Sequence, residues 1–288
     1  ELKVVVDCAA DENPANNEDK VIVEITGDDV DPVEDIKAAE VTGGVLVEWE
    51  MTENLPVTYH EDFESLKMYD RKVPEWTLVD ADNAAIGTLG YLSLPFTKAS
   101  WFALDQNDSE LISYSANNAY SGHMYMSTLY NSKGESNNDW MISPELPGMA
   151  QTISFFAHTY NASYYGLESL EVLYSTTDTE LSSFKSLGTK EIPGDLTETI
   201  PPVSKWYEYS YDLPEGTKYF ALRCVSENVF ALFVDYVTFI KYRTNPTAYN
   251  VYVDGVLSGT AGADDRSFLC RNHLTEGYHT FSVSALYG

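Results

Sequence analysis

The sequence predicts an all-β protein, and three observations lead to this fold class. Apolar residues alternate with polar ones along short runs, which is the period of a strand with one buried face. The 21 tyrosines are concentrated in those runs, as expected of pleated, half-buried surfaces. One short segment, 179–187 (TELSSFKSL), has a helical pattern, and so short a helix is marginal without packing. The short, regular spacing of the runs favours β-sandwiches.

The expected strands follow one another along the whole chain and are separated by turn residues. Trp49 lies in one of them, and we expect it to be buried. The runs are KVVVDC (3–8), KVIVEIT (20–26), GVLVEWE (44–50), TISFFAHTY (152–160), SLEVLYS (169–175), WYEYSYDL (206–213), KYFALRCV (218–225), FALFVDYVTFIK (230–241), YNVYVDG (249–255) and HTFSVSAL (279–286).

The charge balance is strongly acidic, with 45 Asp and Glu against 17 Lys and Arg and a formal net charge of -28. Phosphate backbones and anionic lipid surfaces would be repelled, so we expect no nucleic-acid partner. No apolar run reaches the roughly 18 residues of a membrane-spanning helix, so we expect no membrane insertion. Cations are better candidates as partners, although such a charge can also serve solubility alone.

The chain carries no recognisable enzyme signature. It contains no GxSxG elbow, no HExxH pair and no glycine-rich phosphate loop. The three cysteines, Cys8, Cys224 and Cys270, are far apart, have no metal-binding spacing and allow at most one disulfide. The sequence therefore predicts a protein that is not an enzyme.

Two distant segments are each too small to form a domain. Residues 30–58 supply two strands and residues 242–288 supply about four, and neither set alone buries both faces of a sheet. Together they would form one sandwich of about seven strands. We therefore expect a split host domain that is interrupted by residues 59–241.

The interrupting segment resembles a known family. The matching stretches occur in the family's order: DFES from Asp62, PEWTLVDAD ending at Asp82, NDWMISPEL from Asn138, WYEYSYDLPEGTKYFALRCV from Trp206 and FVDYVTF ending at Phe239. On these stretches residues 59–241 resemble the cleaved-adhesin domain of gingipains and bacterial surface haemagglutinins. The resemblance implies a jelly-roll β-sandwich similar to galactose-binding and other carbohydrate-binding modules.

The flanking segments carry two weaker resemblances. PVEDIKAAEVTGGVLVEWE, YNVYVDGVLSG and LTEGYHTFSVSAL resemble strands of a fibronectin type III domain, and insertion of an adhesin module into such a host is a known arrangement. Residues 1–29 resemble the last two strands of a CARDB-like adhesion domain followed by a linker. Two strands alone are not a stable domain, so we expect them to belong to a preceding module of a longer chain.

A first candidate metal site combines both ends of the inserted segment. Asp62 and Glu64 are two residues apart, so in an extended strand their carboxylates point the same way. Asp235 lies among apolar residues, where a carboxylate needs a counter-charge, a hydrogen bond or a metal. The resemblance implies a structural calcium ion held by Asp62, Glu64 and Asp235. The alternative is solvated acids at a strand edge and a hydrogen-bonded Asp235.

A second candidate site follows from Asp80 and Asp82, which begin like a DxDxDG calcium loop. The fifth and sixth positions are Ala84 and Ala85, so one ligand and the glycine of the family's usual DADGDG are missing. Asp108 or Glu110, in a later acidic loop, are candidates for the missing ligand. The alternative is an ordinary acidic turn.

Aromatic residues in two loops are candidate ligand-binding residues. They could stack on sugar rings or anchor a protein partner, or they could fill the core. Trp101, Tyr91 and Tyr164 are the main candidates, while Trp140 is expected in the core. The loop aromatics are Tyr91, Phe96, Trp101, Tyr160, Tyr164 and Tyr165.

The resemblance implies a function for the whole chain. We expect a non-catalytic adhesin or binding module of a larger secreted or surface-attached bacterial protein, located outside the cell. Its ligand would be a glycan or an extracellular protein, and Ca2+ would be a structural cofactor. The alternatives are an accessory region of a secreted protease or glycoside hydrolase, with the catalytic domain upstream, and a spacer between other domains of the same chain.

Overall fold

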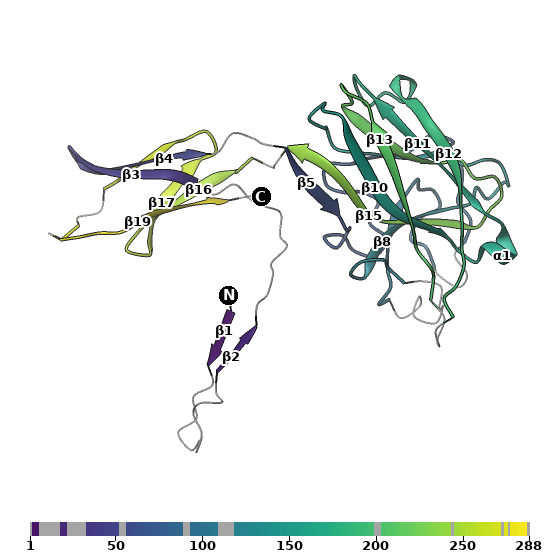
Figure 1. The fold of residues 1–288 in the computed structure, drawn as a ribbon, viewed down its shortest axis with the longest axis horizontal. Coiled ribbons are helices and arrows are strands. Elements are labelled where there is room, and N and C mark those ends of the chain that lie inside the picture. Colours follow the sequence, from purple (N-terminus) through teal and green to yellow (C-terminus); the bar gives the residue numbers. More distant parts are fainter. Residues whose placement is uncertain are drawn as a thin grey trace, which may run out of the picture. The chain divides into compact units, whose positions relative to one another are not determined.

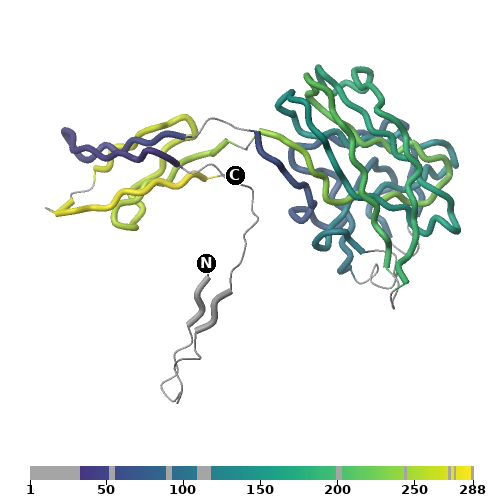
Figure 2. Tube along the Cα trace, in the orientation of Figure 1, coloured from purple at the N-terminus to yellow at the C-terminus, as the bar shows by residue number. Residues whose placement is uncertain are grey.

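The predicted all-β fold class is confirmed. The computed structural model describes residues 2–5, 18–21, 33–51, 56–88, 93–108, 118–198, 203–242, 245–271, 274–275 and 277–286. The chain divides into two compact units, one formed by Glu1–Glu53 with Arg243–Gly288 and the other by Asn54–Tyr242. Figure 1 shows strands in both units, and Figure 2 follows their Cα traces. No helix among the described residues has the length and apolar character needed to cross a membrane.

The unit Asn54–Tyr242 is a sandwich of two antiparallel sheets. The first sheet has the order β13-β10-β15-β8-β7, and β5 also pairs with β15. Its strands are β5 (Pro56–Glu61), β7 (Phe102–Asp105), β8 (Met124–Leu129), β10 (Gln151–Thr159), β13 (Tyr207–Leu213) and β15 (Ala231–Tyr242). The second sheet has the order β12-β11-β14-β9-β6. Its strands are β6 (Thr77–Asp80), β9 (Asp139–Ile142), β11 (Glu168–Ser175), β12 (Lys185–Ile192) and β14 (Tyr219–Cys224).

The main core lies between these two sheets. Phe155 and Val234 from the first sheet and Val172 and Leu222 from the second are in one buried cluster and at most 1% exposed. Alternation along each strand points these residues inward and their neighbours outward. Each large apolar side chain buried in this way contributes about 1.5–3 kcal/mol to folding.

The first sheet is also covered on part of its outer face. Phe102, Leu104, Tyr125 and Phe233 form a second buried cluster there. Strand β8 is consequently buried at all of its positions, and its Ser127 and Thr128 hydroxyls donate hydrogen bonds inside the protein. Within β8, the Ser127 hydroxyl donates to the Phe102 carbonyl at 3.1 Å.

The other unit contains two three-stranded sheets with the orders β17-β16-β19 and β18-β4-β3. Its core contains Val47, Trp49, Tyr249 and Val251, and the predicted burial of Trp49 is confirmed, since 2% of it is exposed. The strands are β3 (Val33–Val41), β4 (Gly44–Met51), β16 (Ala248–Val253), β17 (Val256–Gly262), β18 (Ser267–Cys270) and β19 (Phe281–Leu286). Strands β1 (Leu2–Val5) and β2 (Glu18–Val21) form an antiparallel pair.

Two details differ from the sequence-based expectation. The segment 179–187 is not an α-helix but a single 3-10 turn, η2 (Leu181–Ser183), followed directly by β12. The Ser175 hydroxyl accepts the backbone N–H groups of Thr177 and Asp178, which favours a turn over a helix. The described α-helix is instead α1 (Ala162–Tyr165). Residues 56–58, expected in the host segment, belong to β5 of the inserted unit.

Candidate metal and ligand sites

Three carboxylates converge at one edge of the second sheet. The ligand oxygens of Asp80, Asp82 and Asp139 lie within 4.8 Å of one another, and no other group of three metal-ligating residues in the described ranges meets this criterion. Asp80 ends β6 and Asp139 begins β9, and the two residues are directly paired across the strands. Asp82 follows in the turn after β6. Strand pairing therefore joins two acidic positions that are far apart in the sequence.

Local hydrogen bonds hold the turn in shape. The Asp80 carboxylate accepts the Asn83 N–H at 2.6 Å, and the Asp82 carboxylate accepts the N–H groups of Ala84 at 2.8 Å and Asn138 at 2.7 Å. Asn83 has a φ of 52° and adopts the left-handed conformation. An asparagine tolerates this conformation better than most residues, so the sharp turn forms without the family's glycine.

Asp139 is the buried member of this cluster, with 2% of it exposed. One of its carboxylate oxygens accepts hydrogen bonds from Thr128 Oγ1 at 3.1 Å and Asn137 Nδ2 at 2.8 Å. Burial raises the pKa of Asp139 to about 8, and the charges of Asp82 and Asp80 act in the same direction. Burial also raises the pKa of Asp80. Three converging carboxylates fit a hard cation such as calcium, which prefers oxygen ligands.

The ligand predicted to complete this site is not part of the cluster. Asp108 donates its backbone N–H to the Asp105 carbonyl at 3.0 Å, and its carboxylate is not grouped with Asp80 and Asp82. Glu110, the other candidate, lies outside the described residues. Asp139 takes the third position instead. Its place could not be found from spacing alone, because it depends on the pairing of β6 with β9.

The first predicted site is built around the loop 118–124. Glu64 accepts the backbone N–H groups of His123 and Met124, each at 2.7 Å. Asp235 accepts those of Tyr120 at 2.8 Å and Ser121 at 3.0 Å. The two carboxylates thus fasten one loop from opposite ends of the unit's sequence.

The electrostatics of this loop link Glu64 and Asp235. Asp235 is fully buried, which raises its pKa to about 7 against the opposing effect of its N–H donors, and the charge of Glu64 raises it further. His123 lies between Glu64 and Asp105, with one ring nitrogen 3.1 Å from each carboxylate. Gly122 has a φ of 56°, and a Cβ there would overlap the Glu64 carboxyl group.

The structure places Asp62 differently from the other two predicted ligands. Its carboxylate accepts the N–H of Glu64 at 3.1 Å and does not join Glu64 and Asp235 within metal-binding distance. Its neighbour Glu61 points into the core, where it accepts the indole N–H of Trp76 at 3.3 Å. Burial raises the pKa of Glu61. Glu61 was not expected, since an acid next to two other acids in the sequence suggests an exposed strand edge.

The predicted ligand-binding aromatics have three different outcomes. Trp101 is fully buried, and its indole N–H donates to the Asp139 carbonyl at 3.2 Å, so the prediction that it stacks on a ligand is wrong. Tyr164 lies on α1 and is 78% exposed. Tyr91 lies outside the described residues. Trp140 is 4% exposed, and its expected place in the core is confirmed.

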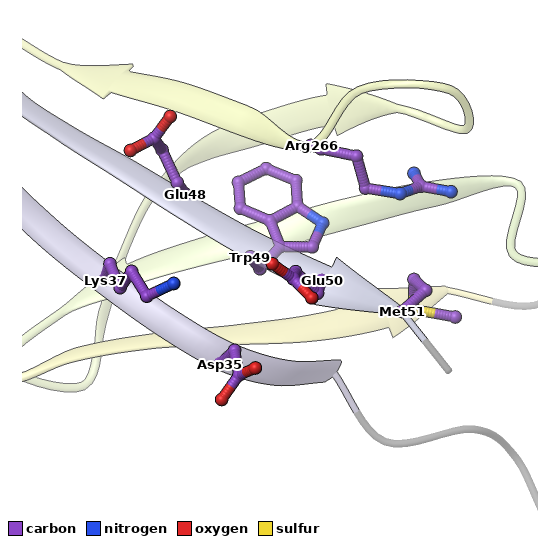
Figure 3. A pocket seen from close by; sticks show the side chains of 7 residues that line it. All are labelled: Asp35, Lys37, Glu48, Trp49, Glu50, Met51 and Arg266. Atoms are coloured by element: carbon purple, nitrogen blue, oxygen red, sulfur yellow. The ribbon is translucent and has the colours of Figure 1, made fainter. Parts of the chain in front are cut away.

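The described residues line two surface hollows that bear on the sites. One of about 650 Å³ adjoins the carboxylate cluster and is lined by residues that include Arg71, Asp80 and Lys98. The other, of about 470 Å³, lies in the smaller unit next to Trp49, where the pairing of β3 with β4 shifts register (Figure 3). Its remaining lining residues are Asp35, Lys37, Glu48, Glu50, Met51 and Arg266.

The larger unit is a two-sheet sandwich whose loops are fastened by carboxylates. Residues 61–239 match the Cleaved Adhesin Domain family, and the chain belongs to this family. No curated protein matches the chain.

Three solved structures of adhesin domains of Lys-gingipain are similar to this chain. The K2 domain has 21% sequence identity and a TM-score of 0.48, with 63% of this chain and 97% of that chain covered. The K1 domain from Porphyromonas gingivalis W83 has 22% identity and a TM-score of 0.47, covering 65% and 99%. The K3 domain from the same organism has 22% identity and a TM-score of 0.42, covering 64% and 97%.

Proposed function

We propose that the chain is a non-catalytic, extracellular binding region of a larger bacterial surface or secreted protein. Its adhesin unit would bind a glycan or an extracellular protein and would use calcium to stabilise its fold. The observation that carries the proposal is the family match over residues 61–239, within which three carboxylates converge.

The calcium part of the proposal rests on Asp80, Asp82 and Asp139. A bound calcium ion would supply the positive charge that compensates three neighbouring carboxylates. It would also displace the proton that burial favours on Asp139. The hydrogen bonds from Asn83, Ala84 and Asn138 orient the two turn carboxylates before any ion binds.

A second calcium ion is part of the proposal at Glu64 and Asp235. Both carboxylates face the same loop, and the charge of Glu64 contributes to the raised pKa of Asp235. Both already accept backbone N–H groups, so this pair supports a cation less strongly than the cluster around Asp139. Asp62 supports it least, because its carboxylate is committed to the N–H of Glu64.

The smaller unit would serve as a host that displays the adhesin unit. Two three-stranded sheets around Trp49 and Tyr249 support the proposed fibronectin type III-like fold. The pair β1 and β2 supports the proposal that residues 1–29 are the end of a preceding CARDB-like module. Other domains of the same longer chain would then be its neighbours.

Calcium-dependent thermal unfolding tests the metal proposal. Extracellular calcium modules have Kd values of about 0.1–1 mM, so about 1 mM free calcium would stabilise the unit by about 0.4–1.4 kcal/mol. That corresponds to a Tm increase of about 1–5 °C for a domain of this size. Asp139→Asn should abolish most of the response, whereas the matched variant Glu191→Gln, an exposed acid on β12, should retain it.

Indistinguishable melting curves in calcium and in excess chelator would refute the calcium proposal. Binding is tested separately, with a glycan array and with immobilised extracellular matrix proteins. Blank results on both, at high protein concentration and in calcium, would favour the spacer role.

A further inference from the structure

The outer face of the first sheet carries a row of polar residues in register. Across β13, β10, β15 and β5 the partners are Ser210, Ser154, Thr238 and His60. His60 Nδ1 lies 2.9 Å from the Thr238 hydroxyl. Their strand neighbours Phe155 and Phe239 are in the main core, so these four side chains face outward. Four strands span roughly 14 Å at the usual strand spacing.

A cluster of aromatic rings adjoins this polar row. Tyr120 lies flat on Phe156, with ring centroids 3.5 Å apart and an angle of 12° between the rings. Tyr236 and Trp206 flank Tyr120 with centroids at 5.8 Å and 6.5 Å. His60 stacks on Tyr236 at 5.1 Å, which joins the rings to the polar row. Phe156 covers one face of the Tyr120 ring, and Tyr120 remains 45% exposed.

The position of Tyr120 is fixed by its backbone. Its N–H donates to the Asp235 carboxylate at 2.8 Å, and that of Ser121 donates to the same oxygen at 3.0 Å. Because Asp235 is fully buried in β15, the loop that carries the ring is attached to the sheet beneath it. A ligand that stacks on Tyr120 would therefore meet a preorganised surface.

The charge of this face selects among ligand classes. Among the described residues, the outward-facing side chains of β5, β10, β13 and β15 include no Lys or Arg, and they include the acids Glu208 and Asp212. Such a face repels anionic polymers. Its hydroxyls, imidazole and carboxylates suit a partner that presents hydroxyl groups, and its rings suit a partner with flat apolar faces.

We propose that this face, defined by His60, Tyr120, Ser154, Phe156 and Thr238, binds a neutral oligosaccharide. The sugar ring would stack on Tyr120, and the hydroxyl groups of the sugar would form hydrogen bonds with the side chains of the polar row. The width of the row suits a chain of several sugars. This inference rests on the proposed role as a binding module and names the ligand class and the surface.

The test uses the full chain in calcium on an array of neutral and anionic oligosaccharides, followed by affinity electrophoresis in soluble neutral and anionic polysaccharides. Tyr120→Ala should weaken binding to neutral glycans at least tenfold, and Tyr120→Phe should retain it. Ser154→Arg should also weaken it, by blocking the polar row. The fully exposed Tyr278 provides a matched control as Tyr278→Ala, which should bind like the unaltered chain.

Tyr164→Ala distinguishes this face from the exposed aromatics of α1. If Tyr164→Ala abolishes neutral-glycan binding while Tyr120→Ala keeps it, the assignment to the sheet face is overturned, although the binding-module proposal stands. Preference for anionic glycans, or binding of proteins with no glycan retained, overturns the ligand class. Thermal unfolding of each variant separates lost binding from lost folding.

Discussion

The buried carboxyl group of Asp139 couples the stability of the fold to its own protonation and to the proposed binding of calcium. Its raised pKa means that the folded chain holds a proton that the unfolded chain releases above about pH 4. Without calcium, this group therefore lowers the free energy of unfolding as pH rises from about 4 towards 8. The loss approaches about 1.4 kcal/mol per pH unit in the range where Asp139 is protonated in the folded chain and ionised in the unfolded chain. Calcium would offset this loss by favouring the ionised form.

Asp139→Asn tests this coupling. The amide can still accept the hydrogen bonds of Thr128 and Asn137, but it carries no charge and cannot titrate. In chelator at pH 8 we expect the variant to be more stable than the unaltered chain, and near pH 4 we expect the two to be similar. Denaturant unfolding between pH 4 and 8.5 measures this. Parallel pH profiles for both chains would contradict the role assigned to Asp139.

At the scale of elements, the loop 118–124 is held by Glu64, from the turn after β5, and by Asp235, from β15. Gly122 is the most crowded position in this loop. Its φ is positive, and the Glu64 carboxyl group occupies the space that a side chain at this position would need. Gly216 also has a positive φ, of 85°, but nothing lies within 4 Å of the place where its Cβ would be. Comparing alanine substitutions at the two glycines therefore separates the effect of backbone strain from that of steric overlap.

We expect Gly122→Ala to lower the free energy of unfolding by more than Gly216→Ala does. Both changes should incur about 1–3 kcal/mol of backbone strain, and only the first also displaces Glu64. Glycan binding should fall for Gly122→Ala alone, because the displaced loop carries Tyr120. Equal losses of stability and unchanged binding in both variants would show that the Glu64 contact does not position the loop.

The alternation of apolar and polar residues decided whether some strands could be predicted from the sequence. Strand β10 alternates and was expected, whereas β8 is buried throughout and lacks that alternation. The residues of the carboxylate cluster also differ in whether the sequence could reveal them. Asp80 and Asp82 were candidates from their spacing, but Asp139 joins them only through strand pairing. Trp101 was assigned to a loop surface because the short strand β7 that follows it was not anticipated.

At the scale of the whole molecule, each unit has its own core and its own buried free cysteine. Cys224 lies in β14 of the larger unit and Cys270 in β18 of the smaller one. Burial raises the pKa of the Cys224 thiol, which makes it unreactive until the unit opens. The two thiols can therefore report separately on the opening of the two units.

Thiol labelling in mild denaturant uses these reporters. If calcium binds where proposed, removing it should speed the labelling of Cys224 severalfold and leave that of Cys270 unchanged. The sites are read by mass spectrometry of peptides after quenching. Equal acceleration at both cysteines would indicate that calcium acts on the whole chain rather than on the adhesin unit.

The pairing of the first and last strands of the larger unit has a mechanical consequence. Strand β5 pairs with the end of β15, from Glu61 opposite Val237 to Pro56 opposite Tyr242. The chain thus enters and leaves this unit at the same end of one strand pair. If the chain is part of a longer protein, as proposed, tension along that protein would be carried by the folded smaller unit and not by the adhesin unit. Under the proposed binding role, the sheet face around Tyr120 would then stay folded until the smaller unit unfolded.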